Sequence, residues 1–285
     1  MPRSEAFQRF AERKTREAER ATIGPLHTVE DRSASFRLRT IGNPWTRAHY
    51  DGDFHLFEPP PNLPAVSMVF VQSRDRNTVV SDPARLGGGA TDTHLIYEGL
   101  SRVAADAVLA GAASVGANAF FSVWHPELVS LRRDLGLARH PAQVVMSERG
   151  RVNLDALLFT VPDIPVFLIL GEDGVRRCEG ALAERPWITV VPATGLDLID
   201  AFRRLRLEHG LTRISHIGGR LAATSVVDAG LIQDLCLTTT AHQGGEPDTP
   251  YYSGPRPPKL ALVVRKQGVG ESLPITVEHF ALTHV

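Results

Sequence analysis

The sequence has few cysteines and no long apolar run. Its 285 residues include two cysteines, Cys178 and Cys236, which lie far apart and form no C-x-x-C pair. We therefore expect neither a disulfide framework nor a structural zinc site. The eleven histidines form no H-x-x-x-H or H-x-H pair on one predicted element, so no metal site is predicted. No stretch of about 18 apolar residues offers a membrane span, and the N-terminus lacks the apolar run of a secretory signal. We expect a cytoplasmic protein without a membrane partner.

An excess of charge of either sign is also missing. The net charge is -1 and the pI is about 6.8, so no basic surface for nucleic acid and no charge block for an anionic membrane is indicated. A small molecule is the expected partner. Apolar residues make up 43% of the chain, which is enough for a packed core in one large domain or two small ones.

Several nucleotide and hydrolase motifs are absent. No G-x-G-x-x-G follows the first predicted strand, and there is neither G-x-x-x-x-G-K-[ST] nor G-x-S-x-G. These absences count against the usual dinucleotide-binding fold, P-loop nucleotidases and α/β hydrolases. The H-x-E and P-C-x-x-C pair of zinc deaminases is missing too.

Buried strands that alternate with helices are present from residue 63 onward. Short apolar runs predict strands at 66–71, 107–110, 143–146, 166–170, 188–191, 214–217 and 235–240. Helices are predicted at 92–104, with Thr91 as a cap, and around Leu198, Phe202 and Leu205 up to Gly210. Residues 259–265 and 276–282 predict a closing antiparallel pair. The pattern indicates an α/β fold with a mostly parallel central sheet flanked by helices.

The first 62 residues have a different pattern. Residues 5–21 predict a peripheral helix that is charged nearly all round, with i,i+4 pairs Glu12–Arg16 and Arg13–Glu17. Alternation from residue 36 and a turn at 51–52 indicate a strand or hairpin, and three prolines at 59–61 close the segment. We therefore divide the chain into an N-terminal extension, 1–62, and a main domain, 63–285.

A glycine pair stands at the most informative point of the chain. Gly218 and Gly219 fall where the strand at 214–217 ends and a helix begins. Bare backbone amides and the positive end of a helix are suited to a phosphate-bearing ligand.

An ordered series of motifs resembles the reductase domain of riboflavin biosynthesis. The series comprises V-S-M-V-F-V-Q-S-R-D from Val66, S-R-V-A-A-D-A-V-L-A-G-A-A-S-V from Ser101, I-G-G, and A-G-L-I-Q-D-L, over roughly residues 63–282. The resemblance implies a dihydrofolate reductase-like fold and a homodimer. It also implies an oxidoreductase that uses NADPH to reduce the ribosyl carbon of a diaminopyrimidine ribosylamino phosphate, like the 5-amino-6-(5-phosphoribosylamino)uracil reductase. For the dimer we expect an exposed apolar edge at 235–240.

The same resemblance implies the cofactor residues. The turn after the strand at 107–110 and the glycine pair would lie against NADPH. Ser147, with Arg149 and Arg151 after it, would meet the adenosine 2′-phosphate, where an arginine fork favours NADPH over NADH. The implied cofactor set is Gly111, Ala112, Ser114, Val115, Ser147, Arg149, Gly218, Gly219, Arg220 and Leu221.

Asp75 is the implied catalytic residue, because it matches the aspartate of the family's S-x-D-G motif, whose carboxylate can accept hydrogen bonds from a pyrimidine. The chain departs from the family in two places here: Arg76 replaces the glycine of that motif, and Ile217 replaces the acid of E-G-G. These changes leave other hypotheses open, namely a reductase of another small heterocycle such as dihydrofolate, or an inactive NADP-binding homologue.

A further departure is the longer segment from His125. Its Arg132, Arg133 and Arg139 either replace substrate-phosphate contacts or lie on a solvated helix. Asp106 keeps the family's position, but an aspartate before a buried strand is more often a cap or an ion-pair partner, here of Arg102. We place neither group in the catalytic set.

Overall fold

The computed structural model describes residues 5–78 and 86–283. The strands are β1 (His27–Asp31), β2 (Leu38–Ile41), β3 (Phe54–Phe57), β4 (Ala65–Gln72), β5 (Ala107–Gly111), β6 (Ala142–Ser147), β7 (Val166–Leu170), β8 (Ile188–Pro192), β9 (Arg213–His216), β10 (Asp234–Thr240), β11 (Lys259–Val269) and β12 (Pro274–Thr283). The helices are α1 (Glu5–Glu19), α2 (Pro44–Tyr50), α3 (Gly89–Thr91), the π-helix η3 (Asp92–Leu100), α4 (Pro126–Asp134), α5 (Glu172–Ala183), α6 (Leu198–Leu207) and α7 (Arg220–Asp228). Short 3-10 turns are η1 (Ser33–Ser35), η4 (Ala112–Ser114), η5 (Leu157–Phe159) and η6 (Thr194–Leu196).

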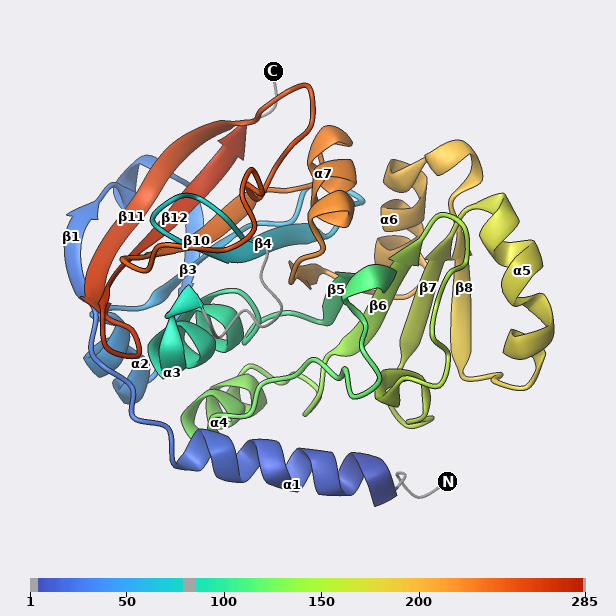
Figure 1. Ribbon diagram of the computed structural model, residues 1–285, viewed down its shortest axis with the longest axis horizontal. Coiled ribbons are helices and arrows are strands. Elements are labelled where there is room, and N and C mark those ends of the chain that lie inside the picture. The colour runs from blue at the N-terminus through green and yellow to red at the C-terminus, as the bar shows by residue number, and fades with distance from the viewer. Residues whose placement is uncertain (1–4, 79–85, 284–285) are drawn as a thin grey trace.

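One ten-stranded sheet organises the molecule, in the order β1-β11-β12-β10-β4-β9-β5-β6-β7-β8 (Figure 1). All neighbours from β10 through β8 in this order are parallel. The strands β1, β11, β12 and β10 are joined antiparallel. The predicted α/β fold, with a mostly parallel sheet and an antiparallel C-terminal pair, is confirmed. Each predicted strand from residue 66 onward is present within one or two residues of its expected ends, except that β11 continues four residues past the expected end to Val269.

Helices cover both faces of the sheet because both faces are apolar. All five residues of β7 are buried, as expected for a parallel strand between two helical layers. One core cluster joins the sheet to α6 and α7 through Phe202 and Val226. A second cluster, with Leu168 and Cys178, packs α5 and α1 on other parts of the sheet, and a third surrounds η3.

The predicted helix at 92–104 begins earlier and has another geometry. A short turn of α-helix, α3, leads into π-helical η3, and the predicted buried residues Ile96, Leu100 and Val103 do lie in the core. Thr91 is not a cap, so that prediction is wrong. Its hydroxyl accepts a hydrogen bond from the Gly24 amide at 3.1 Å and donates one to the Val269 carbonyl at 3.0 Å. Thr91 therefore ties η3 to β11 and to the N-terminal segment.

The N-terminal residues are built into the main sheet. Strand β1 pairs with β11 at its edge, and β2 and β3 form the expected hairpin, with α2 between them. Helix α1 carries both predicted ion pairs at 3.8 and 3.9 Å. It is not charged all round, however, because Phe7 is fully buried and its ring centroid lies 4.7 Å from that of Phe120. In Figure 1, α1 lies along α4, which it contacts.

The segment expected to form an exposed dimer edge is internal. Strand β10 lies between β12 and β4, and Leu235 and Cys236 are fully buried. The predicted dimer surface at 235–240 is therefore wrong, because the C-terminal hairpin covers what would otherwise be an open edge. Within the described residues, no helix is long and apolar enough to cross a membrane.

Candidate functional site

Two glycine turns meet at the carboxyl ends of β5 and β9. A Cβ atom added to Gly219 would lie 2.8 Å from Ser114 Oγ and 3.6 Å from the Gly111 Cα, and one added to Gly111 would lie 2.9 Å from the Ala222 Cβ. Gly219 also has a φ of +83°, which L side chains rarely adopt. Only glycine fits these contacts, so the two turns form a cradle of bare backbone beside the start of α7. An α-helix leaves its first amides without intrahelical acceptors, so the cradle suits a phosphate.

A buried histidine supports the second turn. His216 is fully buried, and burial lowers its pKa to about 4, so the imidazole is neutral. Its Nδ1 accepts a hydrogen bond from the Gly218 amide at 3.4 Å. Gly218 has a φ of +119°, and a Cβ there would lie 4.0 Å from the Phe70 ring. The turn is thus held from beneath and faces a space lined by Phe70.

This space is a cleft of about 550 Å³. Its lining comes from the glycine turns and from β4 and η3: Val69, Phe70, Val71, Thr78, Gly88, Gly89, Asp92, Thr93, Tyr97, Ser114, Phe121, Ile217, Gly218, Gly219 and Arg220. The predicted residues Ser114, Gly218, Gly219 and Arg220 are brought together here. The Arg220 side chain donates to the Asp248 carbonyl at 3.2 Å, which fixes it at the rim.

Arg149 belongs to a cluster of arginines two strands away. It lines a hollow of about 450 Å³ with Asp173, Arg176 and Arg177 of α5. Glycines create this neighbourhood, because a Cβ on Gly150 would lie 2.7 Å from the Gly174 carbonyl oxygen. The turn after β6 therefore presses against the first turn of α5. Sequence reasoning missed both α5 arginines, which lie far along the chain from Arg149.

The spacing of the strand ends gives the distance between the glycine cradle and the arginine hollow. In the sheet, Gly111 pairs with Met146, so Ser147, which is half-buried, lies one residue beyond the level of Gly111. Neighbouring strands are about 4.8 Å apart, so the ends of β9 and β6 are separated by roughly 10 Å. An extended dinucleotide can bridge that distance.

The other predicted cofactor residues flank the cradle. Ala112 and Val115 belong to the turn after β5, where the Val115 amide donates to the Ala112 carbonyl at 3.1 Å and the Val115 side chain is buried in the core. Leu221, in the first turn of α7, is 78% exposed. An apolar side chain with that exposure is available to a ligand. Arg151 is exposed beyond Arg149 and does not line the arginine hollow.

Asp75 is exposed in the turn after β4. Its Oδ2 accepts a hydrogen bond from the Gly244 amide at 3.1 Å, and it does not line the cleft. Arg76, where the resemblance expects glycine, has a φ of +65°. The turn keeps the left-handed backbone that a glycine would favour, although a long side chain now occupies the position.

The remaining candidates have structural roles. Arg132 is buried and donates to the carbonyls of Val103, Ala105 and Ala138, so the alternative of a phosphate contact is wrong for this residue. Asp106 accepts hydrogen bonds from the backbone amides and the hydroxyl at 212–213, which makes it a cap.

Arg102 has no ion pair with Asp106. It instead donates to the Ser122 carbonyl at 2.7 Å, and its guanidinium lies 4.0 Å from the centre of the Tyr97 ring. It thereby fixes a ring that lines the cleft.

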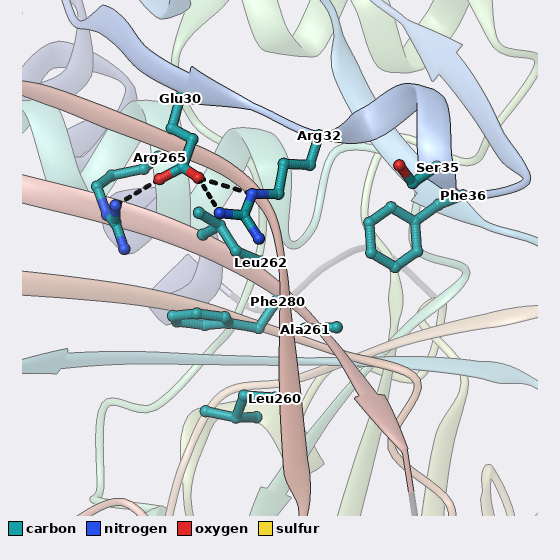
Figure 2. A pocket seen from close by; sticks show the side chains of 9 residues that line it. All are labelled: Glu30, Arg32, Ser35, Phe36, Leu260, Ala261, Leu262, Arg265 and Phe280. Carbon is teal, nitrogen blue, oxygen red and sulfur yellow. Dashed lines mark hydrogen bonds and ion pairs between the residues drawn. The ribbon is translucent and has the colours of Figure 1, made fainter.

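Two other groups of residues are weaker candidates for a functional site. Figure 2 shows a hollow over β11, where Glu30 already bridges Arg32 and Arg265. Asp234, Cys236 and His279 lie within 4.8 Å of one another, although no metal site was predicted. The Asp234 carboxylate is already hydrogen-bonded to His279 Nε2 at 2.9 Å, and burial raises the pKa of the Cys236 thiol well above its usual value.

Comparison with protein families gives one match. Residues 86–266 match the model of the RibD C-terminal domain. No curated protein sequence matches the chain.

Several solved structures share the fold at low sequence identity. A pyrimidine reductase-like protein from Corynebacterium diphtheriae is 18% identical with a TM-score of 0.62, and the match covers 78% of this chain and 93% of that chain. RibD from Acinetobacter baumannii is 14% identical with a TM-score of 0.53, covering 78% and 58%. A diaminohydroxyphosphoribosylaminopyrimidine deaminase/5-amino-6-(5-phosphoribosylamino)uracil reductase from Thermotoga maritima is 14% identical with a TM-score of 0.52, also covering 78% and 58%. The chain thus spans little more than half of the last two proteins.

Proposed function

The chain belongs to the RibD C-terminal domain family, and on this premise we propose that it is an NADPH-dependent reductase. The reaction is hydride transfer to the ribosyl carbon of a diaminopyrimidine ribosylamino phosphate. The observation that carries the proposal is the meeting of the Gly111 and Gly219 turns, where bare backbone and the start of α7 line one cleft. This arrangement fits the diphosphate and nicotinamide end of a dinucleotide.

The chain's own residues would hold the cofactor at two places. The Gly219 amide and the Ser114 hydroxyl would bind the diphosphate, while the Gly218 amide donates to His216 and holds the turn. Ser147, Arg149 and the arginines of α5 would bind the 2′-phosphate, because guanidinium groups form charge-assisted hydrogen bonds with phosphate. The arginine hollow supports a preference for NADPH over NADH.

NADPH supplies the hydride when bound, so the protein needs little acid-base machinery of its own. Its residues align the two reactants and exclude water. Phe70, Phe121 and Ile217 give the cleft an apolar lining, while Arg102 holds the Tyr97 ring in place. A rigid cleft of this kind keeps donor and acceptor carbons in a reactive arrangement.

Asp75 is part of the proposal as a substrate residue. Asp75 lies in the turn after β4, three residues before Thr78, which lines the cleft, and this place supports the role. Its carboxylate also accepts a hydrogen bond from the Gly244 amide. Ile217 favours a second candidate substrate, another small nitrogen heterocycle such as dihydrofolate, because an apolar side chain here accepts no hydrogen bond. A homodimer belongs to the proposal through the family resemblance, and the solution mass tests it. A cytoplasmic location belongs to the proposal as an expectation from the sequence.

The test is NADPH oxidation by the purified chain with three separate substrates: 5-amino-6-(5-phosphoribosylamino)uracil, the diaminopyrimidine ribosylamino phosphate whose deamination gives this uracil, and dihydrofolate. Turnover with either ribosylamino pyrimidine supports the proposed reaction. Turnover with dihydrofolate alone favours the second candidate. NADPH binding without oxidation in the presence of any of these substrates would contradict the proposal that the chain is a reductase.

A further inference from the structure

Strand register brings four polar side chains to one face of the large sheet. Asp234 and Cys236 are two residues apart on β10, so their side chains point to the same face. Cys236 pairs with His279 of β12, and Asp234 pairs with Ser67 of β4. We call Ser67, Asp234, Cys236 and His279 the β10 cluster. Its members come from three neighbouring strands, so the order of the strands brings them together.

The donor atoms of the β10 cluster lie at distances that suit one small metal ion. The ligand atoms of Asp234, Cys236 and His279 all lie within 4.8 Å of one another. The Asp234 Oδ2 is 2.9 Å from the His279 Nε2 and 3.9 Å from the Cys236 Sγ. Metal–ligand bonds of about 2.0–2.3 Å place the donors of a tetrahedral zinc ion roughly 3.3–3.8 Å apart. Small shifts of these side chains would therefore give three zinc bonds.

A small cavity beside the cluster has room for a fourth ligand. Ser67 and Asp234 line this cavity, whose volume is about 20 Å³, together with residues of β3. A water molecule needs roughly 10–15 Å³, so one water fits there. The Ser67 hydroxyl, which donates to the Asp234 Oδ2 at 2.7 Å, is placed to hold that water. Arg213 also lines the cavity, but its guanidinium donates to the Phe57 carbonyl at 2.6 Å.

The three ligand side chains are enclosed in the protein. Cys236 and His279 are fully buried, and Asp234 is nearly so. The Phe57 ring of β3 lies edge-on to the His279 ring, with 5.8 Å between the centroids. A buried cation is costly unless its charge is balanced. A divalent ion with one carboxylate, one thiolate and a neutral imidazole has no net charge.

The cluster holds protons where a metal ion would bind. One lies in the hydrogen bond between Asp234 and His279. The other is on the Cys236 thiol, because burial raises its pKa well above the usual value. A metal ion that binds thiolate and imidazole displaces such protons to solvent.

We propose that Asp234, Cys236 and His279 form a structural zinc site, with a water at the Ser67 hydroxyl as the fourth ligand. Thiolate and imidazole ligands favour zinc over magnesium and calcium, which prefer oxygen ligands. The ion would join β10 to β12 beneath β3, so the N-terminal hairpin would cover it. None of the three ligands lines the cleft, so the site is separate from the proposed reductase chemistry.

Cobalt(II) is the probe for this site, because a thiolate bound to it gives an intense near-ultraviolet absorption band. The full chain, without a histidine tag, is produced in cells grown with Co²⁺ and purified without chelators, so the ion can enter during folding. The sequence has two cysteines, so Cys178→Ser leaves Cys236 as the single thiol. We expect about one metal ion per chain by mass spectrometry, and the band in both wild type and Cys178→Ser.

Variants of the cluster measure the contribution of each residue, through competition with a chelator of known affinity. Cys236→Ser and His279→Gln should weaken metal binding by more than about 100-fold, because loss of an outer partner alone costs about 10–100-fold. Ser67→Ala should weaken it by about tenfold.

Two results would overturn the inference: a wild type without metal, or loss of the band in Cys178→Ser. Persistence of the band in Cys236→Ser would overturn it as well. If Cys236→Ser does not fold, Cys178→Ser still decides the question, since its one thiol either gives the band or does not.

Discussion

The glycine turns after β5 and β9 form one wall of the cleft, whereas side chains of β4 and η3 form the other. The first wall consists of backbone in close contact, with Gly219 against Gly111 and Ser114. The second consists of Phe70, Asp92 and Tyr97 and is partly supported by Arg102.

The two walls should respond differently to substitution. The backbone wall tolerates little substitution at Gly111 and Gly219, because an added Cβ would lie 2.9 Å from the Ala222 Cβ or 2.8 Å from Ser114 Oγ. A side-chain wall can exchange one side chain for another without moving the backbone. We therefore expect variants of the first wall to affect the cofactor and variants of the second wall to affect the substrate.

The largest effect is expected for Gly218→Val. A branched side chain at a φ of +119° is strained by about 1–3 kcal/mol and extends into the cleft, so NADPH affinity should fall by more than about 100-fold. Fluorescence titration measures it. Gly136→Val is the matched control, because its φ is +73° and nothing lies within 4 Å of the added Cβ. Equal cofactor affinity in the two variants would remove Gly218 from the site.

The next effect concerns the choice between cofactors. Arg149→Ala combined with Arg176→Ala should weaken NADPH binding by about tenfold to hundredfold and leave NADH binding unchanged, because only NADPH carries the 2′-phosphate. Parallel titrations of both cofactors measure this. Arg203→Ala on α6, an exposed arginine paired with Asp200, serves as the control. An equal loss for both cofactors would place the arginines elsewhere on the ligand.

A smaller effect is expected on the pH dependence of stability. Burial raises the pKa of Asp92 from its ordinary value of 3.8 to about 6, so the folded protein binds the proton more tightly. The stability from this group is present below pH 4 and is lost as the pH rises through 6. Asp92→Asn should therefore gain about 1–3 kcal/mol relative to wild type on going from pH 4 to pH 8, measured by urea unfolding. A pH-independent difference would contradict the burial of the carboxyl group.

The smallest effect is expected for Asp75→Asn. The amide can still accept the Gly244 hydrogen bond, so the turn should persist. Turnover should fall by about twofold to tenfold while NADPH affinity stays the same, since the expected loss is one hydrogen bond to substrate. Steady-state kinetics measure it, with Asp155→Asn, an exposed acid paired with Arg185, for comparison. Unchanged kinetics would leave Asp75 as a turn residue.

The two walls also differ in how far the sequence predicts them. The strands and the glycine turns follow from short-range patterns, since an apolar run followed by Gly218-Gly219 specifies its own local geometry. The convergence of Arg149 with Arg176 and Arg177 depends on strand order and on glycine contacts between distant segments. Asp92 was expected only as the first residue of a helix. Its burial results from packing against β10, which no local pattern reveals.

The wrong predictions also result from contacts between segments that are distant in the sequence. The segment at 235–240 has the apolar composition of a strand, but its interior place depends on the hairpin of β11 and β12 folding back beside it. Thr91 has the residue type of a cap and instead joins two distant segments. Asp106 is a cap, but its partners are Thr212 and Arg213 and not Arg102.

We expect the glycine-lined cleft and the arginine hollow to bind NADPH together. Titration of the wild-type protein with NADPH and NADH in parallel tests this expectation, with fluorescence or thermal shift as the readout and no substrate present. NADPH should bind tightly, and NADH should bind more weakly by about tenfold or more. No binding of either cofactor, or equal binding of both, would contradict it.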